Sequence, residues 1–249
     1  MEYLNGGREK KIKRDNDKVI RPCNDWTQYV HVFLRYLHSN GFNKVPHPLG
    51  KDEKGNELVS FINGNVYNDM LPDYLRTEET LKRVAGLLKD YHDNSASYVE
   101  LLNGDEKWML LPVEPFEVMC HGDFAPYNVV FENDIPKAII DFDTVHPGPR
   151  LWDISYALYR WVPLMNPENP ESFGDVTDQK NRVEIFLDTY GMFYRENTVI
   201  ENVIMRLESL LDYIFSESGN GNEDFKKNVD DGHHLSYIKD ISYIKKYFR

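Results

Sequence analysis

The chain has 249 residues, of which 41% are hydrophobic and 13% aromatic, and its formal net charge is −12. This length allows one large domain or two modest ones, and the composition is that of a globular protein. The acidic balance argues against a general nucleic-acid binder, and no apolar run approaches the roughly 18 residues that a membrane span needs.

The start of the chain and the cysteine count indicate a cellular compartment. Residues 1–8 lack the apolar core of a secretory signal, and Cys23 and Cys120 are too few and too far apart for a disulfide framework or a zinc cluster. We therefore expect a protein of the reducing cytoplasm that binds neither membrane nor nucleic acid.

Charge is unevenly spread along the sequence. Residues 1–62 hold 11 Lys and Arg against 8 Asp and Glu, whereas residues 63–249 hold 18 against 33. A basic front suits nucleotide phosphates, and an acidic remainder suits metals or a cationic substrate. Simple solubility explains the acidic excess equally well.

The first predicted elements form a small antiparallel sheet. Residues 10–14 and 18–21 flank an Asp-Asn-Asp turn, which predicts a hairpin. A helix with apolar residues on one face follows over 26–37, with Asn24 and Asp25 as candidate caps. The buried strand 58–62 then leads into Asn63-Gly64-Asn65, a natural hinge between two lobes.

The rest of the chain reads as mostly helical. Apolar stripes at helical spacing cover residues 81–91, 154–161, 204–214 and 235–244 and are expected to form core rather than ligand sites. Thr198 and Glu201 have the spacing of a capping box ahead of the third stripe.

One predicted hairpin interrupts these helices. Residues 129–131 and 137–140 are apolar, partly β-branched runs separated by a turn-rich linker over 132–136. Antiparallel pairing would bring Asn128, before the first strand, and Asp141, after the second, to the same end of the hairpin. The loop that carries Asp123 would lie beside them.

These residue types suit phosphoryl transfer. An amide oxygen and a carboxylate are hard ligands for Mg²⁺, so Asn128 and Asp141 are candidate metal ligands. Asp123 remains to orient or deprotonate an attacking hydroxyl. An Asp or Asn beside a strand is often only a turn residue, but the ordered set around one hairpin favours a functional site.

These motifs resemble the catalytic and metal-binding loops of the aminoglycoside phosphotransferase and choline kinase-like family, which has a protein-kinase-like fold. The resemblance rests on His121-x-Asp123 with Asn128, on Asp141-Phe142-Asp143, and on Pro147-Gly148-Pro149-Arg150-Leu151-Trp152-Asp153. It implies an α+β, bilobal protein: a small N-terminal antiparallel sheet lobe over residues 1–63 and a larger, mainly helical C-terminal lobe over 64–249.

The resemblance also assigns roles. ATP or GTP would bind as phosphate donor with Mg²⁺, and the backbone of Ser60, Phe61 and Ile62 would contact its base. His121 would support the loop backbone. Asp143 would ligate metal or contact Asn or Arg groups nearby, and Asp153 would hold a loop or cap a helix.

Two departures from the family pattern concern the nucleotide. The expected first-lobe lysine is replaced by Arg21, which retains the charge and is the candidate contact for the nucleotide phosphates, although the swap is not conservative. The following helix offers no glutamate after Asp25 for the usual ion pair, which is therefore absent or rebuilt. Gly6-Gly7-Arg8 is either a thin phosphate-covering loop or a plain turn.

The sequence thus predicts a small-molecule kinase that acts on a hydroxylated, cationic acceptor such as an aminoglycoside. An acidic stretch either lines the acceptor entrance or is a solvated loop: Glu168, Glu171, Asp175 and Asp178. The alternative is a catalytically silent kinase-like protein that senses nucleotide. A metal-dependent phosphohydrolase would need more ligands than the hairpin supplies.

Overall fold

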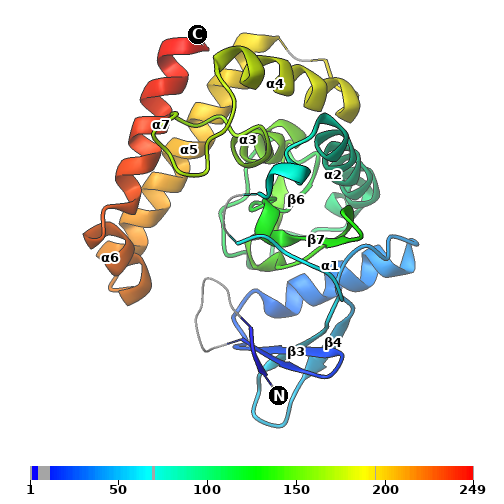
Figure 1. The fold of residues 1–249 in the computed structure, drawn as a ribbon. Helices are drawn as coiled ribbons and strands as arrows, with labels where there is room; N and C mark the ends of the chain where they lie inside the picture. The colour runs from blue at the N-terminus through cyan, green and yellow to red at the C-terminus, as the bar shows by residue number, and fades with distance from the viewer. Residues whose placement is uncertain (1, 5–11, 69–70, 194, 249) are drawn as a thin grey trace. The chain divides into compact units, whose positions relative to one another are not determined.

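The computed structural model describes residues 2–4, 12–68, 71–193 and 195–248 (Figure 1). The chain forms two compact units. The first comprises residues 1–69 and 86–150, and the second comprises 70–85 and 151–249. The long helix α2, Glu78–Val99, contributes to both.

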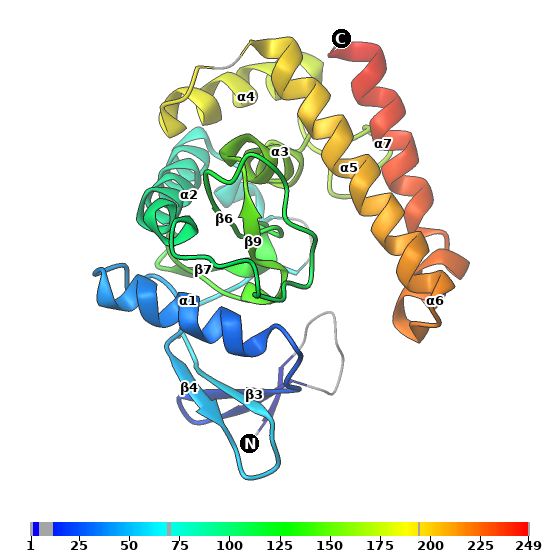
Figure 2. The same cartoon turned by 180° about the vertical axis from the view of Figure 1, so that it is seen from behind.

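The first unit begins with an antiparallel sheet in the order β1-β2-β3-β5-β4. Its strands are β1 Glu2–Tyr3, β2 Lys13–Asp15, β3 Lys18–Arg21, β4 Pro48–Lys51 and β5 Glu57–Ser60. Helix α1, Thr27–Ser39, lies along this sheet in both views of the ribbon (Figures 1 and 2). The predicted hairpin and helix are confirmed.

The predicted cap of α1 is wrong. The N-cap position is Trp26, which makes no side-chain cap bond. Neither Asn24 nor Asp25 caps the helix; instead the Thr27 hydroxyl accepts a hydrogen bond from the Asn24 backbone N–H at 2.9 Å. The hydroxyl of Thr27, the first residue of the helix, thus stabilises the turn over residues 24–27 that precedes α1.

The first unit also contains two small sheets, β6 paired with β9 and β7 paired with β8. The bounds are β6 Val118–Cys120, β7 Val129–Glu132, β8 Ile135–Ile139 and β9 His146–Gly148, with 3₁₀ turns at Pro126–Asn128 and Phe142–Thr144. The predicted hairpin is confirmed, but β8 begins at Ile135, two residues earlier than expected. Asn133 and Asp134 both have positive φ, which is typical of the two-residue turns that hairpins favour.

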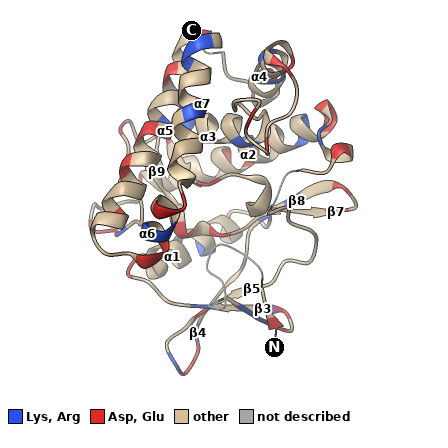
Figure 3. Cartoon of the chain, turned by 60° about the vertical axis from the view of Figure 1, so that its left-hand side comes forward, with Lys and Arg blue, Asp and Glu red and all other residues tan. Residues whose placement is uncertain are grey.

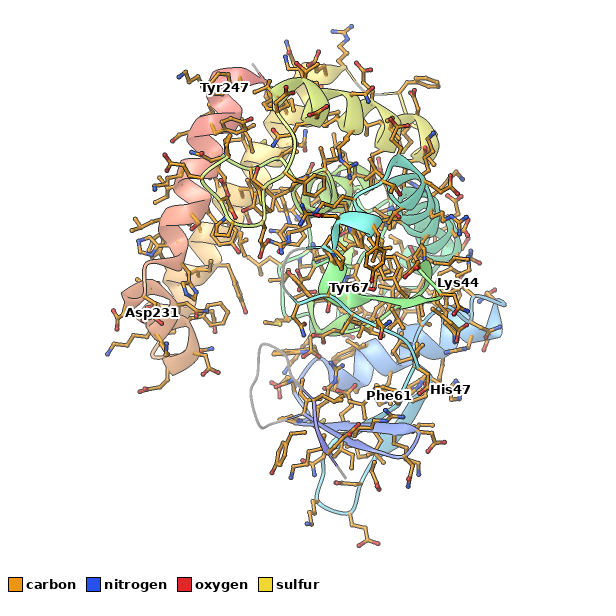
Figure 4. All side chains as sticks on the ribbon, in the orientation of Figure 1. Lys44, His47, Phe61, Tyr67, Asp231 and Tyr247 are labelled. Carbon is orange, nitrogen blue, oxygen red and sulfur yellow. The ribbon has the colours of Figure 1, made fainter. Side chains whose placement is uncertain are left out.

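The segment between the sheet and the hairpin is anchored at both ends. Asn65 exchanges two backbone hydrogen bonds of 2.8 Å with Phe131 of β7. A Cβ on Gly64 would lie 2.4 Å from the Phe131 carbonyl oxygen, so the close approach requires glycine. Phe61 and Tyr67 mark the two ends of the segment in Figure 4, and the Tyr67 ring packs on Phe131 at 5.6 Å.

The second unit is helical. It contains η1 Asp73–Leu75, most of α3 Arg150–Trp161, α4 Val176–Tyr190, α5 Glu196–Gly219, α6 Glu223–Asp230 and α7 His233–Tyr247. Helices α5 and α7 run side by side in both views. The predicted capping box at Thr198 is wrong, because α5 begins two residues earlier, at Glu196.

An N-terminal antiparallel sheet is therefore followed by a mainly helical part, as the sequence predicts. Within the described ranges, none of the helices combines the length and the apolar character that crossing a bilayer requires.

Candidate active site

The loop after β6 is held in place by His121, which is fully buried. Its Nε2 donates to the Ile140 carbonyl at 2.9 Å, and its Nδ1 accepts from the Asp123 backbone N–H at 3.3 Å. The Thr144 hydroxyl donates to the His121 carbonyl at 2.8 Å. These contacts tie the loop that carries Asp123 to the loop that carries Asp141.

Gly122 allows the two loops to lie this close. It has φ +81°, and a Cβ there would lie 2.6 Å from the Thr144 carbonyl oxygen. Both the backbone conformation and the missing side chain are therefore needed between His121 and Asp123.

An aromatic cluster supports both loops from the core. The Phe142 ring lies 4.9 Å from the His121 ring, 5.8 Å from Tyr91 of α2 and 6.4 Å from Phe33 of α1. These edge-on and tilted contacts between large buried rings fix the residue that follows Asp141.

The Asp123 carboxylate accepts hydrogen bonds at both oxygens. The Tyr127 hydroxyl donates to Oδ1 at 2.6 Å, and the Asn128 amide nitrogen donates to Oδ2 at 2.9 Å. Asn128 also donates to the Asp123 backbone carbonyl at 2.9 Å. The side chain of Asp123 is therefore oriented before any substrate arrives.

The end of the hairpin brings Asn128 and Asp141 together, as expected from antiparallel pairing. The Ile140 N–H donates to the Asn128 carbonyl at 2.9 Å, which sets the following Asp141 beside Asn128. Asp141 has a left-handed backbone, with φ +60°, and its side chain is 46% exposed.

This donor set fits a magnesium ion that also binds substrate phosphates. Both hydrogens of the Asn128 amide are directed at Asp123, so its amide oxygen is the atom available as a ligand. Asp141 uses Oδ1 for an ion pair and retains Oδ2. Among the described residues no three His, Cys, Asp or Glu side chains form a metal cage, which is compatible with Mg²⁺, since it typically takes one or two carboxylates plus water and phosphate oxygens.

The usual lysine–glutamate ion pair, which the sequence predicts to be absent or rebuilt, is rebuilt around Arg21. Nε and Nη2 of Arg21 lie 2.5 and 3.3 Å from the two carboxylate oxygens of Glu57, its partner across β3 and β5. Helix α1 contributes His31, whose Nε2 lies 2.8 Å from Glu57 Oε1. A strand glutamate and a helix histidine thus replace the usual helix glutamate.

Arg21 also contacts the loop that carries Asp141 and Asp143. Its Nη1 lies 2.6 Å from Asp141 Oδ1, and its Nη2 lies 3.2 Å from Asp143 Oδ1. Although burial opposes it, the charges of Asp143, Asp141 and Glu57 raise the pKa of Arg21. Burial would raise the pKa of Glu57, but the hydrogen bond from His31 and the charge of Arg21 lower it overall.

The predicted nucleotide-base segment is partly committed to the sheet. The Ser60 N–H donates to the His47 carbonyl at 2.9 Å, and the Phe61 N–H donates to the Asp17 carbonyl at 2.7 Å. Among the described residues, the backbone N–H and C=O of Ile62 make no such bond. The Arg14 guanidinium covers the Phe61 ring at 3.7 Å.

The remaining predicted residues are Asp143, Asp153 and the segment Gly6-Gly7-Arg8. Asp143 is buried, and its Oδ1 lies 3.3 Å from the Trp26 indole nitrogen as well as near Arg21, so it contacts nearby donors. Asp153 is fully buried in the first turn of α3, in the second unit. Gly6-Gly7-Arg8 lies outside the described residues.

The acidic stretch has structural partners. Asp175 and Asp178 form the capping box of α4. Glu171 pairs with Arg160 at 2.7 Å, and Glu168 pairs with Lys239 at 3.3 Å. Of the two alternatives, these contacts favour the solvated loop over a lining of the acceptor entrance.

Sequence reasoning missed Glu57 and Tyr127. Tyr127 had a usable signal, because a phenol four residues after Asp123 and directly before Asn128 is well placed to reach the same carboxylate. Glu57 had none in the linear spacing, because only the register between β3 and β5 sets it opposite Arg21.

Comparison with known proteins agrees with this geometry. The profile described as the phosphotransferase enzyme family matches residues 100–174, which include Asp123, Asn128 and Asp141. The trifolitoxin immunity protein of Rhizobium leguminosarum bv. trifolii is 29% identical over 197 residues, covering 76% of this chain and 73% of that protein.

Solved structures share the fold at low identity. The choline kinase LicA from Streptococcus pneumoniae superposes with a TM-score of 0.61 at 14% identity, covering 99% of this chain and 93% of that one. A spectinomycin phosphotransferase in complex with ADP and spectinomycin gives a TM-score of 0.57 at 13% identity, covering 100% and 89%. Residues 100–174 are therefore similar to the phosphotransferase enzyme family, and the chain has the kinase-like fold of these aminoglycoside phosphotransferase and choline kinase structures.

Proposed function

We propose that this protein is a small-molecule kinase that transfers the γ-phosphoryl group of MgATP or MgGTP to the hydroxyl of a cationic, hydroxylated acceptor. The observation that carries the proposal is the Asp123 carboxylate, held at both oxygens by Tyr127 and Asn128 beside the exposed carboxylate of Asp141. A kinase needs such a positioned base next to hard metal ligands.

In the proposed reaction the acceptor oxygen forms a bond to the γ-phosphorus, the bond from that phosphorus to the bridging oxygen breaks, and a nucleoside diphosphate leaves. Asp123 accepts the proton of the acceptor hydroxyl. Asn128 and Asp141 hold the metal, which when bound neutralises charge on the phosphates. Most of the catalytic effect therefore comes from positioning and electrostatics.

The proposal of a cationic, hydroxylated acceptor rests on the named relatives and on the acidic excess of residues 63–249. The spectinomycin phosphotransferase holds spectinomycin, and the Streptococcus pneumoniae protein is named a choline kinase. The Rhizobium relative is named a trifolitoxin immunity protein, which makes trifolitoxin a further candidate acceptor. Aminoglycosides, amino alcohols and trifolitoxin are therefore the first acceptors to test.

The test uses wild type and Asp123→Ala with Mg²⁺, ATP or GTP, and a pool of these acceptors, with mass spectrometry to detect phosphorylated products. Loss of the base is expected to reduce turnover by roughly 10²–10⁴-fold while largely sparing nucleotide binding. Asp141→Ala is expected to weaken metal-dependent nucleotide binding. Asp188→Asn, an exposed change on α4, is the matched control and retains full turnover.

Full activity of Asp123→Ala would contradict the proposal. Nucleotide binding without transfer to any acceptor would favour the second candidate, a catalytically silent nucleotide sensor. That candidate is supported by Arg21, which is engaged with three carboxylates where a family lysine would contact phosphates.

A further inference from the structure

The guanidinium of Arg21 is engaged on two of its edges. The edge formed by Nε and Nη2 faces both oxygens of Glu57, at 2.5 and 3.3 Å. The edge formed by Nη1 and Nη2 faces Asp141 at 2.6 Å and Asp143 at 3.2 Å. The side chain is only 9% exposed, so these partners and not solvent surround the charge.

Counting donors limits what else this side chain can bind. A guanidinium has five N–H groups, and hydrogen bonds to Glu57 and Asp141 use three of them. The buried Asp143 carboxylate forms a further ion pair with Nη2 at 3.2 Å. To bind two phosphate oxygens, Arg21 would have to release Asp141 from Nη1 and weaken the ion pair with the buried Asp143 at Nη2, which is unfavourable.

We propose that Arg21 is a positioning residue for Asp141-Phe142-Asp143, the metal loop of the proposed site, rather than a ligand of the nucleotide phosphates. It holds Asp141 Oδ1 and Asp143 Oδ1 and so offsets the repulsion between two nearby carboxylates, while Asp141 Oδ2 stays available for the metal. The inference rests on the proposed kinase function.

Further contacts fix Arg21 itself. Glu57 lies opposite Arg21 across β3 and β5, and it is held in turn by His31 of α1 at 2.8 Å. Trp26, at the start of the same helix, donates to Asp143 at 3.3 Å. The sheet, helix α1 and the metal loop are thus joined through one charged cluster. Groups that support metal ligands in this way typically change metal affinity by 10–100-fold when removed.

The test measures a fluorescent ATP analogue binding to wild type, Arg21→Met, Arg21→Lys and Glu57→Gln, first in EDTA and then across a Mn²⁺ titration. Affinity in EDTA is expected to stay within about two-fold of wild type. The Mn²⁺ concentration for half-maximal binding is expected to rise about 10–100-fold in each variant, because Asp141 is no longer held. Lys18→Met, an exposed change on the same strand, is the control and leaves both values unchanged.

A phosphate ligand would behave differently. If Arg21→Met loses ten-fold or more of its affinity in EDTA while the Mn²⁺ midpoint stays unchanged, Arg21 contacts phosphate and the inference is overturned. Circular dichroism checks that each variant is folded, and Glu57→Gln, which keeps Arg21 and the side-chain volume, is the second route if Arg21→Met does not fold. Absence of nucleotide binding by wild type, with or without Mn²⁺, would instead refute the proposed kinase function and the inference with it.

Discussion

At the residue scale, Asp123 depends on two neighbours for its orientation. Asn128 holds Asp123 and is also a proposed metal ligand, so its substitution would mix two effects. Tyr127 contacts the same carboxylate through its hydroxyl at 2.6 Å and has no place in the metal site. The phenol is therefore the cleaner probe of how far orientation of the base matters.

Tyr127→Phe removes that hydroxyl and keeps the ring. We expect kcat to fall by roughly 10- to 150-fold, since a hydrogen bond to a charged group is worth about 1.5–3 kcal/mol, while the KM for nucleotide changes little. Steady-state kinetics with the acceptor found by mass spectrometry measures both constants. Tyr74→Phe, in the second unit, is the control. Unchanged kcat in Tyr127→Phe would show that Asn128 and the loop backbone suffice.

The residues that the sequence identified and those it missed differ in a physical way. Asp123, Asn128 and Asp141 are close in sequence and joined by one hairpin, so local spacing brings them together. Glu57 and Arg21 meet only because of strand register, which depends on turns and packing that linear spacing does not encode.

At the element scale, Asp175 and Asp178 of the acidic stretch cap helix α4. The Asp175 side chain accepts from the backbone N–H groups of Thr177 and Asp178, and Asp178 returns a bond to the Asp175 N–H at 3.0 Å. The backbone N–H groups of Asp175, Thr177 and Asp178 at the start of α4 therefore all have hydrogen-bond acceptors. Capping of α1 and α5 was predicted wrongly because cap residues act through backbone dihedrals at a boundary that is uncertain by one or two positions.

Asp175→Ala is expected to lower the free energy of unfolding by about 1 kcal/mol, because two N–H groups of α4 lose their acceptor. Urea unfolding followed by circular dichroism measures the loss. Asp188→Ala, near the other end of the same helix, removes a carboxylate that opposes the helix dipole and is expected not to destabilise. Equal losses in the two variants would mean that the cap contributes nothing specific.

At the scale of the whole molecule, charge is shared evenly between the compact units. The first unit holds 15 Lys and Arg against 21 Asp and Glu, and the second holds 14 against 20. Figure 3 shows both signs interspersed on the elements of each. The difference in charge between residues 1–62 and the remainder thus does not follow the compact units. The acidic loops that carry Asp123 and Asp141 belong to the same unit as the basic sheet. The division at residue 63 stays a prediction.

Because both units carry excess negative charge, salt is expected to stabilise the protein. Raising NaCl from about 10 mM to 0.2 M shortens the Debye length from about 30 Å to under 10 Å and screens this repulsion. The Tm should rise by a few degrees, since exposed ion pairs that salt weakens contribute little each. Thermal unfolding monitored by circular dichroism tests this, with KCl as the control for ion-specific effects. A lower Tm in salt would mean that attractive pairs outweigh the net repulsion.

The left-handed backbone of Asp141 has a consequence for engineering and for evolution. Residues other than glycine are disfavoured by about 1 kcal/mol at φ +60°, and Asp and Asn tolerate it best. A glycine at 141 would relieve that backbone strain and remove the carboxylate in one step. A screen that selects for stability alone would therefore favour loss of the Asp141 carboxylate, which the proposed reaction requires. A glycine or other non-acidic residue at this position in a related chain would indicate a protein that has lost turnover and gained stability.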